Sequence, residues 1–143
     1  MKKETAGSEK VSVNFLPMEL GQIDALVEQG YYADRSDLIR TAVRAELEKR
    51  SEDLEIILKG TLPHETATSK GDGLIVATGI VKLGCKELND YKDRGVRLNI
   101  KMIGALIIEQ DVSLELVKET IEKVKVWGKI RASDEIRHML TEI

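Results

Sequence analysis

The sequence has few of the residues from which disulfides and transition-metal sites are built. Cys85 is the single cysteine among 143 residues, so no intrachain disulfide can form, and we expect a cytoplasmic protein. The only histidines are His64 and His138, too few and too scattered to make a nitrogen and sulfur ligand cluster with that cysteine. Sites of oxygen ligands stay open, but we expect no metal and no cofactor.

Long apolar segments are missing as well. The longest strongly apolar run, "MIGALII" at residues 102–108, is far too short to span a bilayer. The first residues carry two lysines with no apolar stretch behind them, which is not the pattern of a secretory signal. We therefore expect no membrane partner.

Aromatic residues and net positive charge are also scarce. Aromatic side chains make up 3% of the chain, so the core must be built from Val, Ile, Leu and Ala. The net charge of −3 disfavours nonspecific binding to nucleic acid, because that affinity comes from Lys and Arg that neutralise phosphates. A nucleic-acid partner would have to meet a local cationic face. We also find no nucleophile–base pair, phosphate-binding glycine loop or paired carboxylates, so we expect no enzyme and no catalytic residue.

Polar and apolar side chains alternate strictly along "KVSVNFLP", residues 10–17. Val11, Val13 and Phe15 point to one side of the predicted strand. The other side carries Lys10, Ser12 and Asn14. A lone strand of this kind is unstable, because its backbone groups are unpaired and its apolar side is open. We expect the same strand of a second chain to pair with it antiparallel about a two-fold axis.

Two helices are predicted after this strand. Pro17 suits the first turn of a helix, and Gly30 suits its C-terminal cap. Ser36 is the expected N-cap of the second helix, with Asp37 in its first turn. Nothing in the sequence breaks this second helix before Gly60.

Residues 11–50, "VSVNFLPMELGQIDALVEQGYYADRSDLIRTAVRAELEKR", resemble the ribbon-helix-helix DNA-binding family of the Arc, MetJ and CopG type. The likeness rests on the alternating strand that ends in "LP", on "EL..ID.LVE.G.Y" in the first helix and on "RSDLIRTAVR" in the second. It covers only the first third or so of the chain. It implies a swapped two-stranded ribbon in a dimer that reads the major groove of DNA.

The resemblance also implies roles for individual residues. Asn14 is the best candidate for reading a base, since an amide can pair bidentately with adenine, and Lys10 could reach guanine or a phosphate. Ser12 is compatible with either role. The expected phosphate contacts, at the start of the second helix and in the N-terminal arm, are Arg35, Ser36, Lys2 and Lys3. The expected dimer core consists of Val11, Val13, Phe15, Leu38, Ile39 and Val43.

Two observations qualify the resemblance. Asp37 stands beside the expected phosphate site, where its charge repels phosphate unless it points away. Residues 1–50 contain eight Lys and Arg against nine Asp and Glu, which departs from a basic DNA-binding domain. We expect binding that depends on sequence and on the pairing of dimers. Arg40 and Arg44 are either helix-surface charges or DNA contacts.

The second half of the chain contains an internal repeat. Three segments align on Gly79, Gly104 and Gly128, spaced 25 and 24 residues apart, and each has two β-like runs around the glycine and then a helical segment. Ser113 and Ser133 are the expected N-caps of the second and third of these helices. The glycine-rich stretch at residues 60–73 predicts a linker. The expected domains are therefore residues 1–59 and 74–143.

Two positions of the repeat have two interpretations each. Trp127 stands where the preceding unit has Ile103, so we expect it in the core of the repeats, with stacking on a ligand as the alternative. Cys85 is expected to be a small buried apolar residue. The role of residues 74–143 is either to join dimers into a higher oligomer through open sheet edges or to bind an effector or a protein partner.

These features predict an α+β protein, with a ribbon-helix-helix dimer followed by a small β/α repeat domain. The leading hypothesis is a transcriptional regulator, of the repressor type, that binds operator DNA. One alternative is an antitoxin that binds a toxin as well as DNA. The other is an assembly protein with no role in DNA binding, in which the hairpin only dimerises and its polar side is solvated.

Overall fold

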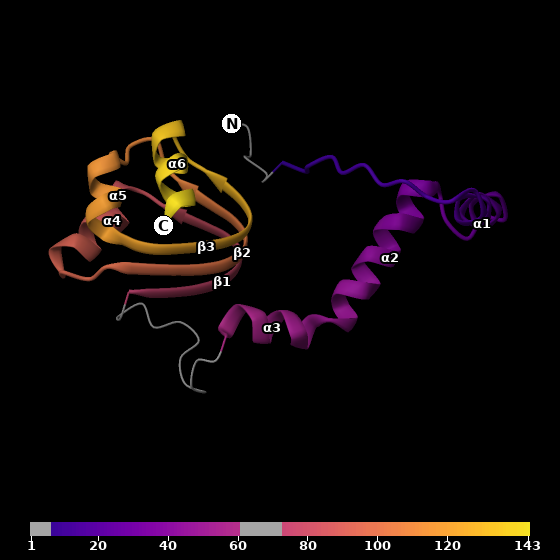
Figure 1. Ribbon diagram of the computed structural model, residues 1–143, viewed down its shortest axis with the longest axis horizontal. Helices are drawn as coiled ribbons and strands as arrows, with labels where there is room; N and C mark the ends of the chain where they lie inside the picture. The colour runs from indigo at the N-terminus through magenta and orange to yellow at the C-terminus, as the bar shows by residue number, and fades with distance from the viewer. Residues whose placement is uncertain (1–6, 61–72) are drawn as a thin grey trace. The chain divides into compact units, whose positions relative to one another are not determined.

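The computed structural model describes residues 7–60 and 73–143, which form six helices and a three-stranded parallel sheet (Figure 1). The chain divides into two compact units, Met1–Glu55 and Ile56–Ile143. This division falls inside a helix, whereas the linker predicted at residues 60–73 lies outside the described residues except for Gly60 and Gly73. The α-helical part and the β/α part thus follow one another along the chain.

Helix α1 (Pro17–Glu28) begins and ends as its sequence predicts. Pro17 opens the first turn, and the Glu19 carboxylate accepts a hydrogen bond from the backbone N–H of Leu16 at 2.9 Å. At the other end, the N–H of Gly30 bonds to the carbonyl of Val27, and the N–H of Tyr31 bonds to that of Leu26. This pair of bonds satisfies carbonyls that a helix otherwise leaves without partners.

The second helix differs from its prediction at both ends. Asp34 is the N-cap of α2 (Arg35–Lys49), because its carboxylate accepts the N–H of Asp37 at 2.8 Å, so the predicted cap at Ser36 is wrong. The helix also stops at Arg50 instead of continuing to Gly60, and α3 (Ser51–Lys59) follows at once. No glycine or proline marks this interruption, which explains why the sequence did not predict it.

Residues 7–16 form no regular element in the single chain (Figure 1). The strand predicted over residues 10–16 is therefore not formed here, and the swapped ribbon is not shown. A strand is defined by its hydrogen bonds to a neighbouring strand, and a single chain gives this segment no such neighbour.

The second unit alternates strands with helices and stacks the strands in the order β1-β2-β3, all parallel. Its elements are β1 (Leu74–Leu83), α4 (Cys85–Asp93), β2 (Leu98–Ile108), α5 (Leu114–Thr120), β3 (Ile121–Arg131) and α6 (Asp134–Glu142). The three strands curve together, and α4, α5 and α6 lie on one face of the sheet (Figure 1). Each strand continues without interruption through its glycine, whereas the sequence predicted two short runs on either side.

The register brings the three repeat glycines side by side. Gly79 pairs with Gly104, and Gly104 pairs with Gly128, as the alignment of the three segments predicts. A Cβ added to Gly104 would overlap the backbone carbonyl of Gly79, and one added to Gly128 would overlap that of Gly104. Gly104 and Gly128 are therefore needed because the neighbouring backbone occupies the space of a side chain.

The core of the second unit lies between the sheet and its helices. Alternate residues of the central strand (Ile100, Met102, Leu106 and Ile108) are buried there with residues of α4, α5 and α6. The predicted caps Ser113 and Ser133 are confirmed, since their hydroxyls accept the N–H groups of Leu116 and Ile136 at 3.2 and 3.4 Å. Cys85 is half-buried and packs against this core.

Candidate nucleic-acid interface

The described part of the first unit buries almost none of its apolar side chains. Val11 is 79% exposed, Val13 64% and Phe15 38%, and Ile23 is the one buried residue among residues 7–55. Lys10, Ser12 and Asn14 are exposed as well. Both sides of the predicted strand therefore face solvent in the single chain, and its apolar side lacks the cover that would stabilise it.

An open hollow of about 350 Å³ lies between this segment, α1 and α2. Apolar side chains line most of it, and the polar contributions come from Asn14 and Arg35. Its lining residues are Val13, Asn14, Phe15, Leu20, Ile23, Arg35 and Ile39. Three residues of the predicted dimer core (Val13, Phe15 and Ile39) thus line one hollow.

The other residues of the predicted dimer core lie close by in the sequence but differ in exposure. Leu38 is half-buried like Ile39, whereas Val43, one turn further along α2, is 51% exposed. Leu47 continues this exposed stripe at 52%. The apolar side of α2 is therefore covered at its start and open toward its end.

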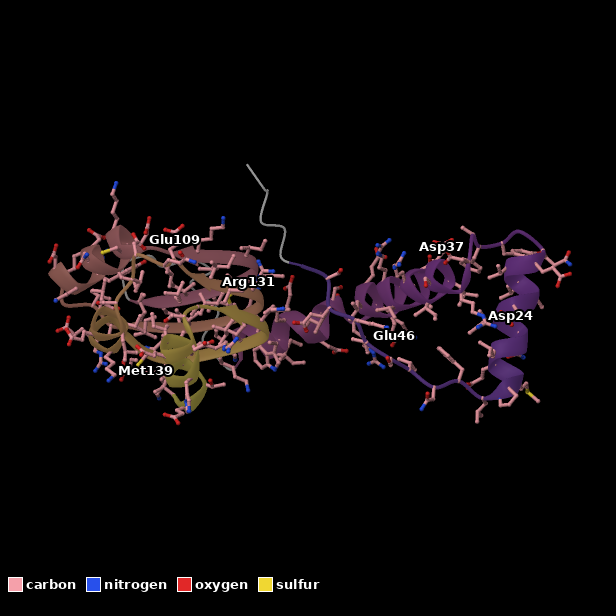
Figure 2. The ribbon with its side chains drawn as sticks, turned by 90° about the horizontal axis from the view of Figure 1, so that it is seen from above. Asp24, Asp37, Glu46, Glu109, Arg131 and Met139 are labelled. Carbon is pink, nitrogen blue, oxygen red and sulfur yellow. The ribbon has the colours of Figure 1, made fainter. Side chains whose placement is uncertain are left out.

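Arg35 is held by a carboxylate of the same chain. Its Nε and Nη2 atoms each lie 2.7 Å from a carboxylate oxygen of Asp24 (labelled in Figure 2), so the pair is bidentate and joins α1 to α2. The hydrogen bonds and the charge of Arg35 lower the pKa of Asp24, and the same bonds raise the pKa of Arg35. Arg35 was predicted to contact phosphate, and its pairing with Asp24 was not predicted from the sequence.

The start of α2 is occupied by carboxylates. Asp34 accepts the N–H of Asp37 (labelled in Figure 2), and the Asp37 carboxylate accepts the N–H of Ala33 at 3.0 Å. Ser36 is exposed between them. Two negative charges at this helix terminus disfavour a phosphate there, unless cations of the dimer or of the arm offset them. Asp34 could have been recognised as a cap, because Asp ranks with Ser at that position.

The remaining candidate residues are either exposed or outside the described residues. Lys2 and Lys3 lie outside the described residues. Arg40 and Arg44 are exposed on α2. His138 lies 3.3 Å from Glu142 on α6, and His64 lies outside the described residues. Across residues 7–60 and 73–143, no group of three or more His, Cys, Asp or Glu side chains is arranged to hold a metal ion, and no helix is long and apolar enough to cross a membrane.

Trp127 was expected in the core of the repeats, and this expectation is wrong. It is the register partner of Ile103, as the alignment predicts, but its side chain is 36% exposed and lies outside the buried cluster. The reason is parity: Val124, Val126 and Ile130 of β3 pack against the core, so Trp127 faces the opposite side.

Comparison with known proteins extends the resemblance seen in residues 11–50. No curated protein and no solved structure matches the chain. The Ribbon-Helix-Helix transcriptional regulator family matches over residues 6–137, which includes most of the second unit as well as the first. The first-third limit suggested by the sequence motif is therefore too narrow, and the chain belongs to the ribbon-helix-helix transcriptional regulator family.

Proposed function

We propose that the protein is a sequence-specific DNA-binding repressor that reads the major groove with a two-stranded ribbon formed by residues 10–16 of two chains. The observation that carries this proposal is the exposure of both sides of that segment in the single chain. Exposure of the apolar side to water is unfavourable in free energy, and the polar side chains that alternate with it are accessible to a ligand. Membership of a family of transcriptional regulators supports DNA as that ligand.

Burial of the apolar side gives the energy for dimerisation. A Val or Phe side chain that moves from water into a packed interior stabilises by about 1.5–3 kcal/mol. Val11, Val13 and Phe15 are exposed in the single chain, and a two-fold axis doubles their number. The hollow lined by Val13, Phe15 and Ile39 is where we place the apolar residues of the partner.

Dimerisation in this manner sets the polar side chains in two antiparallel rows. Lys10, Ser12 and Asn14 of both chains then share the solvent side of the ribbon, which fits the width of the major groove. Asn14 is the residue we expect to read adenine, and Lys10 is the one we expect at guanine or at a phosphate. The single chain leaves all three exposed.

The second unit offers open edges for a further level of assembly. Within the described residues, β1 and β3 each pair with β2 alone, so one side of each strand has no strand beside it. Such edges favour association with another chain. We propose that this unit joins dimers, which raises the effective concentration of the second dimer on an operator with two half-sites.

The decisive experiment measures the preference of the intact protein for a selected sequence. Sites are selected from random duplex DNA, and binding to the best site is compared with binding to a scrambled duplex of the same length. Asn14→Ala should lose about 1–3 kcal/mol of this discrimination with little change in folding. Gln110→Ala, which removes an exposed amide from the second unit, serves as the matched control and should change nothing.

The same experiment separates the proposal from the reading of the ribbon as a dimerisation hairpin. If Asn14→Ala binds the selected site as well as the wild type does, the polar side of the ribbon does not read DNA. If the wild type does not distinguish the two duplexes, the protein is not a sequence-specific regulator.

A further inference from the structure

The sheet of the second unit has one side that α4, α5 and α6 do not cover. Residues at alternate positions, such as Ile100 and Met102, pack into the core toward α4, α5 and α6. The residues between them point to the other side, which we call the outer face. Every Lys and Arg of the three strands stands at such a position: Lys82, Lys101, Lys123, Lys125, Lys129 and Arg131.

Charge is sorted between the two sides of this unit. Residues 74–143 contain twelve Lys and Arg and eleven Asp and Glu, so the segment is nearly neutral. Six of those twelve cations stand on the strands, against one of the eleven carboxylates, Glu122. The other carboxylates lie on the helices and connections, for example Glu109 after β2 (Figure 2). Such sorting gives the outer face a positive potential that the net charge of the chain conceals.

Along the central strand, the outer face is more open in its first half than in its second. Ala105 and Ile107, in the second half of β2, point outward but are buried. In the first half, Lys123 and Lys125 are exposed and Lys101 is half-buried. An open depression of about 670 Å³ adjoins these three lysines, and Lys59 and Gly60 at the end of α3 and the last residue, Ile143, also line it.

The lysines of this half lie closer together than their charges favour. Lys101 and Lys125 are direct register partners on adjacent strands, and Lys123 stands two residues before Lys125 on the same side. Like charges placed directly opposite each other destabilise a sheet. The Trp127 ring lies 5.8 Å from the Lys101 ammonium and 5.4 Å from that of Lys125, which offsets part of this repulsion. An anion would offset more of it.

We propose that the outer face, around Lys101, Lys123 and Lys125, binds the phosphate backbone of duplex DNA independently of sequence. The choice of DNA as the polyanion rests on the proposed function. The first fifty residues carry eight cations against nine carboxylates and leave a shortage of phosphate contacts that this face supplies. Interfaces between proteins are depleted in charge and in Lys at their centre, which disfavours a protein partner here.

The spacing of the cations is compatible with this role. Lys123 and Lys125 are two strand positions apart, or roughly 6.6 Å, and adjacent strands are roughly 4.8 Å apart. The three ammonium groups can therefore meet neighbouring phosphates of one DNA strand. Because the face is joined by the chain to the ribbon unit, a duplex held by the ribbon meets it at high effective concentration.

The test uses the full chain and the salt dependence of DNA binding. Lys123→Gln/Lys125→Gln removes two charges from the outer face. The control, Lys86→Gln/Lys118→Gln, removes two charges from exposed positions on α4 and α5, so both variants have the same net charge. Each protein is titrated with the selected duplex and with a scrambled duplex at several salt concentrations between about 0.05 and 0.3 M, which gives the slope of log affinity against log salt. Folding of all variants is checked by far-ultraviolet circular dichroism, because Lys125 contacts the ring of Trp127 and its loss would alter the fluorescence of that residue directly.

The outer-face variant should bind both duplexes more weakly by the same factor, on the order of tens of fold at about 0.1 M salt. The slope of its log affinity against log salt should become less negative by about 1.8 for each protomer that contacts DNA. The helix-layer variant should keep the wild-type slope. Equal slopes for the wild type and the outer-face variant would overturn the proposal, even if the wild type prefers the selected site.

Failure of the proposed function has a different signature. A wild type that binds both duplexes equally, with a slope that depends on Lys123 and Lys125, would remove sequence reading and support the outer face. In a third measurement, binding of a polyglutamate peptide to the same proteins is tested. If it binds in a manner that depends on these lysines while DNA binding does not, the face recognises an acidic protein surface, and the proposal for DNA is refuted.

Discussion

Replacement of Gly104 by alanine should destabilise the second unit strongly. The backbone at Gly104 has φ of +135°, a conformation that an L-residue adopts only with strain of about 1–3 kcal/mol. The added Cβ would also overlap the carbonyl of Gly79 on the adjacent strand. Because that atom belongs to the backbone, no side-chain rotation relieves the overlap, and strand β1 or β2 must move.

The chain contains a matched control for the second effect. Gly79 has φ of +113°, but a Cβ placed there would meet no atom within 4 Å. Gly79→Ala should therefore cost about 1–3 kcal/mol from backbone strain alone. Gly104→Ala should cost that amount plus about 1–3 kcal/mol for the overlap, roughly 2–6 kcal/mol together. The free energy of unfolding of a whole domain is about 5–15 kcal/mol, so this loss is a large part of its stability.

Urea unfolding monitored by tryptophan fluorescence measures this difference. Trp127 is the only tryptophan and lies on β3, so its signal reports on the second unit and not on the helical one. The unfolding midpoint should fall in the order wild type, Gly79→Ala, Gly104→Ala. If Gly104→Ala is no less stable than Gly79→Ala, the close stacking of the three glycines is not what stabilises this sheet.

Three further outcomes are expected. Phe15→Ala should cost about 3–5 kcal/mol where the ring is buried between two chains, and should lower dimer formation in sedimentation and DNA affinity together; a wild type that is monomeric at all concentrations would contradict the shared ribbon. Asp24→Asn should destabilise the first unit near neutral pH in helix-monitored unfolding. Because the pKa of Asp24 is lowered in the folded chain, its contribution to the free energy of unfolding is present above its unfolded pKa of about 3.9 and is lost as the pH falls through the folded pKa. The stabilities of wild type and variant should therefore converge in acid. A difference in stability that persists at low pH would show that the pair does not act through charge. Ser113→Ala should cost about 0.5–2 kcal/mol in the same urea assay, because the hydroxyl that accepts the N–H of Leu116 is lost, and no change would mean that water replaces the cap.

Features that depend on a few neighbouring residues were predictable from the sequence. Pro17 and Gly30 bound the first helix, and Ser113 and Ser133 cap two others, because capping uses groups within three or four positions of each other. The period of the glycines predicted their register, since a repeated unit that stacks on itself places equivalent residues side by side. The alternation of residues 10–16 likewise marked a segment whose apolar side is exposed in the single chain.

Features that depend on distant residues were decided by the tertiary structure. Asp24 and Arg35 lie eleven positions apart on two helices, and only the packing of α1 on α2 brings their charges to 2.7 Å. The exposure of Trp127 and the sorting of the lysines onto the outer face follow from which side of the sheet the helices cover. The sequence contains the alternation of the strands, but the side that meets solvent is chosen where the helices pack, because only burial against them distinguishes the two faces.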